Sequence, residues 1–277
     1  MNAIEMNARP HRDFTLHIQE AQGVLAQAAA QYAASEGGAV RVTQASSLGA
    51  EDVVISHIIN SMQLDIGIFV LETGRLHKET LALLEQFKAD SRAPVTIYKP
   101  VEEAVVQFVA KEGLDAMYKS MDLRKACCGI RKMEPLERAL KGKEAWITGL
   151  RREQSGARAE VPLVDTSEAR VKINPLANWT WGDVWHYIQL NKVAYNPLHD
   201  AFFPSIGCEP CTRAIAMGED FRSGRWWWES ENAKECGLHV KPHSDPAGDV
   251  SQSETLSTLA SAQANFATSE VKGSALP

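Results

Sequence analysis

Short apolar segments alternate with amphipathic segments through the first 150 residues of this chain. The apolar segments VRVTQA, DIGIFVLET, VTIYKP and EAWITGL are expected to form strands. Apolar residues at helical spacing predict helices over residues 14–35, 51–62, 76–90 and 101–113. Strands that alternate with helices predict an α/β fold, with a mostly parallel, twisted sheet covered by helices on both faces.

The second half of the chain adds fewer regular elements. VKINPL (171–176) is expected to add an edge strand, and TWGDVWHYIQLN (180–191) is expected to form a helix. Beyond about residue 240 the chain is small and polar and lacks dense apolar periodicity. We therefore expect one domain over residues 1–240 and a disordered tail over residues 241–277.

Charge and hydropathy exclude some classes of protein. A formal net charge of -6 argues against a sequence-independent nucleic-acid binder, which needs a basic face to neutralise phosphates. No segment approaches the roughly 20 uninterrupted apolar residues that span a bilayer. The N-terminal residues lack an apolar core that could act as a signal peptide. A cytoplasmic protein without a membrane or nucleic-acid partner is expected.

The first expected strand leads directly into a loop of small residues, QASSLGAED, and then a helix. In open α/β sheets ligands collect at the carboxyl ends of strands, where a helix N-terminus offers free amides to an anion. Ser46, Ser47 and Gly49 would let a phosphate approach the backbone. An ordinary turn with a serine cap is the alternative, and the loop alone does not decide between them.

Two further strand ends carry residues suited to anions. LETGR places Thr73, Gly74 and Arg75 after the second strand, and TGLRREQSGAR follows the fourth. A guanidinium fits phosphate and sulfate oxygens, although a charged loop is more often only solvated. Three loop arginines are candidates at the fourth strand, namely Arg151, Arg152 and Arg158.

The segment FRSGRWWWE adds Arg222 and Arg225 beside three consecutive tryptophans. Core packing, a base-stacking wall and a partner surface all stay open for Trp226, Trp227 and Trp228.

Five cysteines are divided into four and one, a pattern typical of a metal centre with a spare thiol. Cys208 and Cys211 form a CxxC pair whose sulfurs would face the same way on a helical turn. Cys127 and Cys128 are adjacent, and neighbouring helical residues diverge by about 100°. A four-iron cluster tolerates that spread better than a single zinc ion. KACCGIRK surrounds the adjacent pair with the cations Lys125, Arg131 and Lys132.

The fifth cysteine, Cys236, lies in the polar segment KECGLH. Lys234 and His239 are its charged or titratable neighbours, and cations near a thiol favour the thiolate. The segment predicts a reactive cysteine rather than a buried structural one.

Seven segments of this chain together resemble the assimilatory adenosine 5′-phosphosulfate (APS) reductases. They are SSLGAEDVV, LETGR, CCGIRK, TGLRREQS, KINPL, GCEPCTR and ECGLH. The resemblance runs from about residue 40 to residue 240. These enzymes are related to the 3′-phosphoadenosine 5′-phosphosulfate (PAPS) reductases and, more distantly, to the ATP pyrophosphatases. The resemblance implies a sheet of the adenine nucleotide alpha hydrolase type. The loop SSLGAED departs from the SGGxDS pattern of the ATP-hydrolysing relatives, which argues against ATP hydrolysis.

The resemblance also implies roles for single residues. Four cysteines would hold a [4Fe-4S] cluster, namely Cys127, Cys128, Cys208 and Cys211. Cys236 would be the nucleophile. Ser47, Leu48 and Gly49 match the phosphate loop, and Leu71 and Gly149 match positions that line the nucleotide. Five residues match groups that bind or approach the phosphosulfate, namely Lys132, Arg158, Arg222, Arg225 and His239.

The implied reaction belongs to assimilatory sulfate reduction and cysteine biosynthesis. The Cys236 thiolate attacks the sulfur of APS, AMP leaves, and thioredoxin releases sulfite from the resulting S-sulfocysteine. PAPS reduction is an alternative, although the cluster cysteines point to the substrate without a 3′-phosphate. A metal- and nucleotide-binding regulatory protein is the alternative outside enzymes, and a homo-oligomer stays open.

Overall fold

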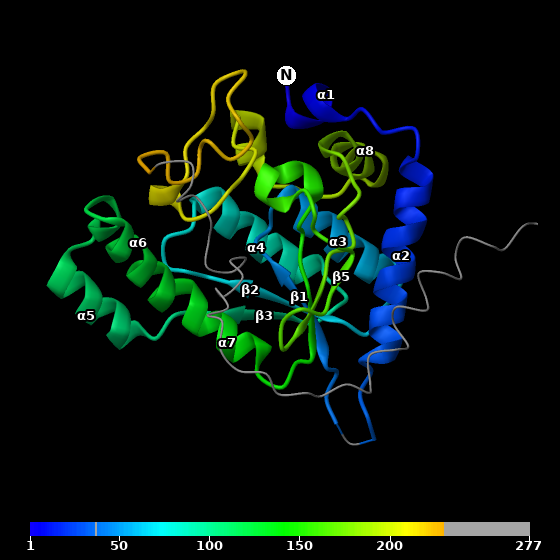
Figure 1. The fold of residues 1–277 in the computed structure, drawn as a ribbon, viewed down its shortest axis with the longest axis horizontal. Helices are drawn as coiled ribbons and strands as arrows, with labels where there is room; N and C mark the ends of the chain where they lie inside the picture. The colour runs from blue at the N-terminus through cyan, green and yellow to red at the C-terminus, as the bar shows by residue number, and fades with distance from the viewer. Residues whose placement is uncertain (37, 230–277) are drawn as a thin grey trace, which may run out of the picture. The chain divides into compact units, whose positions relative to one another are not determined.

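The computed structural model describes residues 1–36 and 38–229 (Figure 1). Within these residues one six-stranded sheet has the order β3-β2-β1-β4-β6-β5. All neighbours are parallel except β5 and β6. The strands are β1 (Val42–Ser46), β2 (Gly67–Leu71), β3 (Val95–Tyr98), β4 (Ala145–Ile147), β5 (Val164–Asp165) and β6 (Val171–Ile173). The predicted α/β fold with a mostly parallel sheet is confirmed.

Helices cover both faces of the sheet. Successive strand residues point to opposite sides, so apolar strand side chains pack against helices on each face. On β2, Ile68 and Val70 join the larger core, which also contains residues of α3 (Ala50–Ser61) and α4 (Lys78–Asp90). Phe69 points the other way and packs with Leu136 of α7 (Glu134–Leu140). Figure 1 shows α7 in front of the sheet and α3 behind it.

The larger core extends beyond α3 and α4. It also includes buried residues of α2 (Phe14–Gln31) and α8 (Trp181–Asn191). The N-terminal segment is tied to the start of α8, where Asp183 accepts a hydrogen bond from the backbone of His11 at 2.7 Å. His17 Nδ1 lies 3.2 Å from the second oxygen of Asp183. The remaining α-helices are α1 (Ala3–Asn7), α5 (Glu102–Glu112) and α6 (Met121–Cys128).

One strand differs from its expected place. VKINPL was expected to form an edge strand, but β6 lies between β4 and β5. The outer neighbour β5 is only two residues long and pairs antiparallel to β6, with Val164 opposite Ile173. Two residues are too few to carry an alternating pattern, so this strand has no signal of its own in the sequence. The prediction of an edge strand at residues 171–176 is therefore wrong.

The remaining predictions on organisation have mixed outcomes. Among the described residues, no helix combines the length and hydropathy needed to cross a bilayer. The expected end of the domain near residue 240, and the expected tail, lie outside the described residues and stay predictions.

Candidate functional site

A cavity lies at the point where the strand order of the sheet reverses. From β1 the chain moves outward through β2 and β3, then returns to place β4 on the other side of β1. Ligands of such sheets bind in the crevice outside the carboxyl ends of these two strands. A cavity of about 210 Å³ lies there, lined by the loops that follow β1 and β4.

The loop after β1 is held by a carboxylate from the following helix. Asp52 accepts hydrogen bonds from the Ser47 amide at 2.7 Å and from the Ser47 hydroxyl at 2.6 Å. Gly49 is the residue before α3 and has no side chain to cap the helix, so the first amides of the helix stay available to an anion. Ser47 and Gly49 both line the cavity.

Leu48 differs from its neighbours in this loop. Its φ of 60° is left-handed, which is uncommon for a residue with a β-carbon. Its side chain is fully buried in the larger core and does not line the cavity. Leu48 therefore belongs to the loop by its backbone and to the core by its side chain.

Asp52 has an unusual environment for a carboxylate. Its pKa is raised to about 6, mainly by burial and to a smaller extent by Glu51, while the hydrogen bonds from Ser47 and from the Gly149 backbone oppose the shift. Asp52 is thus a titratable group inside the cavity that would receive an anion. The SSLGAED pattern contained this residue, but nothing in its spacing marked it as a loop anchor.

Gly149 lets the loop after β4 approach this carboxylate. A β-carbon on Gly149 would lie 2.5 Å from Asp52 Oδ1 and 2.9 Å from Glu51 Cβ. Only glycine fits this approach of the two loops without a shift in α3. The same loop then turns back through Gln154, whose amide donates to the Gly149 carbonyl at 3.1 Å and to Glu51 at 2.9 Å.

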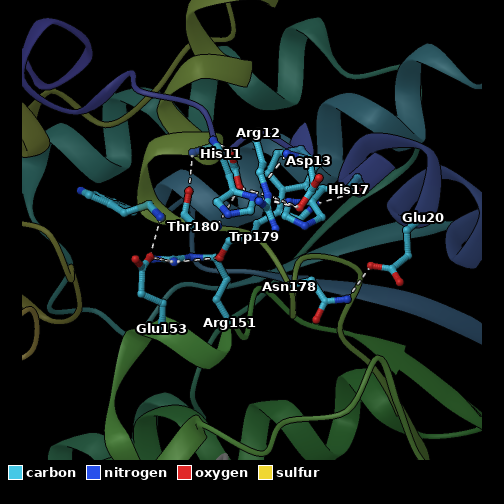
Figure 2. A network of polar contacts seen from close by, with 12 residues as sticks. His11, Arg12, Asp13, His17, Glu20, Arg151, Glu153, Asn178, Trp179 and Thr180 are labelled. Carbon is cyan, nitrogen blue, oxygen red and sulfur yellow. Dashed lines mark hydrogen bonds and ion pairs between the residues drawn. The ribbon is translucent and has the colours of Figure 1, made fainter. Parts of the chain in front are cut away.

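The structure separates the roles of the three loop arginines. Arg158 lines the cavity, and its guanidinium donates to Gln154 Oε1 at 2.6 Å. Arg151 is fully buried and pairs with Glu51 at 2.9 Å. It also pairs with Glu153 at 2.8 Å (Figure 2). Arg151 therefore braces the loop from behind the cavity.

The third loop arginine, Arg152, is also absent from the cavity lining. It binds the Val161 carbonyl at 2.8 Å and Asn178 at 2.6 Å. Of the three candidates, the geometry leaves Arg158 as the one that faces the cavity. The Gln154 contact that orients it was missed, although the residue stands in the LRREQS motif.

The opposite wall brings together cations that are distant in the sequence. Arg222 and Arg225 line the cavity from the chain after the CxxC pair, and Lys132 lines it from the turn after Cys128. Gly207 permits this packing, because a β-carbon there would lie 2.5 Å from the Arg225 guanidinium. Together with Arg158, these side chains form a cationic rim, which is suited to a doubly charged anion.

The predicted substrate-binding residues thus have different outcomes. Eight of them line the cavity, namely Ser47, Gly49, Leu71, Lys132, Gly149, Arg158, Arg222 and Arg225. Leu48 is turned into the core, and His239 lies outside the described residues, as does Cys236. Whether any of them contacts a ligand stays a prediction.

The four predicted metal ligands lie together. Cys127, Cys128, Cys208 and Cys211 line a second, smaller cavity of about 20 Å³. Cys208 and Cys211 flank a single 3₁₀ turn, in which the Cys211 amide donates to the Cys208 carbonyl at 2.9 Å. Cys127 and Cys128 end α6, and a π-helical turn over Gly129–Met133 follows at once. Cys127 and Cys128 themselves keep helical backbone, and the wider turn begins one residue after them.

Several contacts tune the cysteine site. The Thr73 hydroxyl lies 3.2 Å from the sulfur of Cys208. Burial, with the neighbouring Cys208 and Cys128 thiols, raises the pKa of Cys211 to about 12. Burial likewise raises the pKa of Cys127, although Arg131 opposes the shift. Buried thiols of this kind ionise only when a positive centre replaces the lost solvation.

Four sulfur donors are the ligand type that iron–sulfur clusters use. Four thiols share one cavity, and four cations also line it, namely Arg75, Arg124, Arg131 and Lys132. Such cations offset the negative charge of thiolate ligands. Within residues 1–36 and 38–229, no group of three or more Cys, His, Asp or Glu side chains is arranged to hold a single metal ion. Lys132 lines both this cavity and the larger one.

The tryptophan run, left open by the sequence, divides between core and surface. Trp226 is buried and packs with Cys208 and Cys211 in a small apolar cluster. Trp227 is 39% exposed, and both Trp227 and Trp228 contact the ring of Tyr118. Core packing is therefore the role of Trp226, beneath the cysteine site.

Comparisons with known proteins agree on one family. The family model of the phosphoadenosine phosphosulfate reductase domain matches residues 41–214. Adenosine 5′-phosphosulfate reductase from Burkholderia cepacia is 54% identical over 202 residues, which cover 72% of this chain and 81% of the relative. The protein of the same name from Allochromatium vinosum is 52% identical over 197 residues, covering 70% of this chain and 77% of the relative.

Solved structures agree on the fold. The phosphoadenylyl-sulfate (PAPS) reductase from Candida auris, in a phosphate complex, is similar with a TM-score of 0.56 and 29% identity. The match covers 68% of this chain and 88% of that one. The FMN adenylyltransferase of Candida glabrata, at 10% identity and a TM-score of 0.51, shares the fold alone, over 81% of this chain and 77% of that one.

Proposed function

Because the chain belongs to the phosphoadenosine phosphosulfate reductase domain family, we propose that it reduces adenosine 5′-phosphosulfate to sulfite and AMP in assimilatory sulfate reduction. The observation that carries the proposal is the pair of adjoining cavities. A crevice of about 210 Å³ with a cationic rim meets a site of four cysteines, and Lys132 lines both.

The larger cavity supplies distinct contacts for the two ends of the substrate. Arg158, Arg222, Arg225 and Lys132 bind the phosphosulfate, whose charge their side chains neutralise. The first amides of α3, beside Gly49, bind phosphate oxygens. Leu71 and Gly149 line the rest of the cavity, where the adenosine is accommodated.

The unphosphorylated 3′ position is favoured by the relatives. Proteins named adenosine 5′-phosphosulfate reductase are 54% and 52% identical to this chain, whereas the PAPS reductase structure is 29% identical. The four cysteines that meet in the second cavity point in the same direction. PAPS reduction is the runner-up, and a comparison of turnover with the two substrates distinguishes them.

Cys127, Cys128, Cys208 and Cys211 would hold a [4Fe-4S] cluster, which when bound supplies an electrostatic field beside the substrate rather than an electron path. Cationic side chains of the protein interact with both the cysteine site and the substrate. Lys132 stands between the thiolates and the larger cavity, and thereby couples the charge of one site to an anion in the other.

The chemical steps use one cysteine and an external dithiol. The Cys236 thiolate attacks the sulfur of the sulfonyl group, and the bond between that sulfur and the phosphate oxygen breaks. AMP leaves with the electron pair, and S-sulfocysteine remains. A thiolate of thioredoxin then attacks Cys236 Sγ, and sulfite leaves with the electron pair of the S–S bond. The second thioredoxin thiol closes the donor's disulfide and returns Cys236 as a thiol. Since the reaction consumes a dithiol, the cytoplasm is the fitting compartment.

Mass spectrometry tests this proposal directly. Anaerobically purified protein mixed with adenosine 5′-phosphosulfate, without reductant, should gain about one SO3 group on the peptide that contains Cys236. Cys236→Ser should keep the iron chromophore but form no adduct and release no sulfite. Thioredoxin-dependent sulfite release by Cys236→Ser would refute the assignment. Nucleotide and metal binding without any adduct in the wild type would favour the regulatory alternative.

A further inference from the structure

A buried ion pair lies where the described chain ends. Arg124 Nε is 2.6 Å from Glu229 Oε1, and Arg124 Nη2 is 2.9 Å from Glu229 Oε2. The two side chains are 2% and 8% exposed. Glu229 is the last described residue and stands seven positions before Cys236. The pair thus fixes the chain immediately before the segment that carries the nucleophile.

The same guanidinium belongs to the cysteine site. Arg124 lines the cavity of the four cysteines, and its side chain is hydrogen-bonded to Cys128. Its guanidinium carbon lies 4.6 Å from the centre of the Trp226 ring. One side chain therefore contacts a predicted cluster ligand, a core tryptophan and the carboxylate at the start of the terminal segment.

The backbone between the two sites strengthens this link. The Trp226 amide donates to the Cys211 carbonyl at 3.2 Å, and the Glu229 amide donates to the Trp226 carbonyl at 2.9 Å. The neighbouring Arg225 lines the substrate cavity and lies 4.7 Å from the same tryptophan ring. Residues 225–229 therefore run from the substrate cavity, past the cysteines, to the anchor on Arg124.

The chemistry of the pair suits positioning better than bulk stability. A buried ion pair is often no more stabilising than apolar residues of the same volume, because both charges lose their water. A two-point guanidinium–carboxylate contact, however, fixes one geometry. The pair therefore serves to fix the position and direction of the backbone where it leaves the cysteine site.

We propose that Arg124 is a positioning residue that fastens Glu229 to the cysteine site and so fixes the direction in which the chain continues toward Cys236. The inference rests on the proposed function, since it takes Cys236 to be the nucleophile. It gives the cysteine site a task without electron transfer.

Trypsin provides a readout that does not depend on turnover. Lys234 lies between the anchor and Cys236, so cleavage after Lys234 reports how often this stretch becomes accessible. Glu229→Gln should raise the cleavage rate roughly tenfold or more, because a charged hydrogen-bond pair is lost.

Substrate chemistry provides the second readout. Adduct formation at Cys236 should fall about 100-fold in Glu229→Gln, as expected for a misplaced nucleophile. AMP affinity should not change, because Glu229 does not line the substrate cavity. A merely structural role would instead weaken AMP binding and adduct formation together.

Glu219→Gln is the matched control. Glu219 also forms a two-point pair, with Arg213 at 2.9 and 2.8 Å, but that pair is about one-third exposed and lies outside both cavities. Both readouts should match the wild type. Arg124→Lys, which keeps the charge but loses the fork, carries the test if Glu229→Gln does not fold.

Unchanged cleavage after Lys234 and unchanged adduct formation in a folded Glu229→Gln or Arg124→Lys protein would overturn the inference. If the wild type forms no adduct at Cys236, the proposed function fails instead. The cleavage comparison still decides whether Arg124 anchors the segment.

Discussion

Replacing Gly149 with alanine would force apart the two loops that meet at the reversal of strand order. The new β-carbon would lie 2.5 Å from Asp52 Oδ1 and 2.9 Å from Glu51 Cβ, well inside van der Waals contact. Both neighbours are 8% exposed and belong to the first turn of α3, so neither can swing into solvent. Overpacking of this kind typically costs about 1–3 kcal/mol of the free energy of unfolding.

Gly149→Ala should reduce turnover and AMP affinity by more than it reduces the free energy of unfolding. Relief of the clash moves Asp52, which holds both the amide and the hydroxyl of Ser47. A displacement of the loop by about 1 Å can lower turnover about 100-fold, because the reacting groups lose their alignment. AMP affinity, measured by calorimetry, should fall in Gly149→Ala at the same time.

Urea unfolding and AMP titration of Gly149→Ala and Gly156→Ala form the assay. Gly156 lies in the same loop, and its added β-carbon would meet nothing within 4 Å. Gly156→Ala should leave the unfolding midpoint and AMP affinity close to those of the wild type. If Gly149→Ala matched Gly156→Ala in both measurements, the close approach of the loops would not matter and the reasoning would be refuted.

Three further changes have defined outcomes. Asp52 has a folded pKa of about 6 against an ordinary pKa of 3.8, so the unfolded chain holds fewer protons between these values. The free energy of unfolding should therefore fall by about 3 kcal/mol as pH rises through this window. Asp52→Asn should show a smaller fall in the midpoint of urea unfolding over the same pH range. The same pH dependence in Asp52→Asn and the wild type would contradict the raised pKa of Asp52. Arg158→Ala should raise KM about 10-fold or more, whereas Arg152→Ala should not. Equal KM values in the two variants would contradict the placement of Arg158 alone at the cavity. Cys211→Ser should lose iron and the visible chromophore yet keep AMP affinity within a few-fold; full iron content would remove Cys211 from the ligand set.

The sheet was predictable because its strands carry a strong local pattern. β2 alternates Ile68 and Val70 with Phe69, and each set packs against helices on its own face. The strand β5 was not predictable, since its two residues depend on pairing with β6 rather than on their own pattern. Strand pairing is a tertiary property, and a short partner leaves no trace in the sequence.

The site shows the same division between composition and placement. The four cysteines could be grouped by type and spacing, and the structure brings them to one cavity. Arg151 and Arg158 stand in one basic loop, and nothing local tells which faces the cavity. The answer depends on Glu51, which is distant in the sequence and draws Arg151 into a buried pair. Trp226 was equally undecided, because its burial depends on the cysteines beside it.

Leu48 has a consequence for the thermodynamics of binding. A left-handed leucine is unfavourable by itself, yet here the buried side chain offsets that cost through the core. The loop can change its backbone only by withdrawing Leu48 from the core, so its shape persists without a ligand. An incoming anion therefore loses little conformational entropy to loop ordering, and most of the interaction energy is retained as affinity.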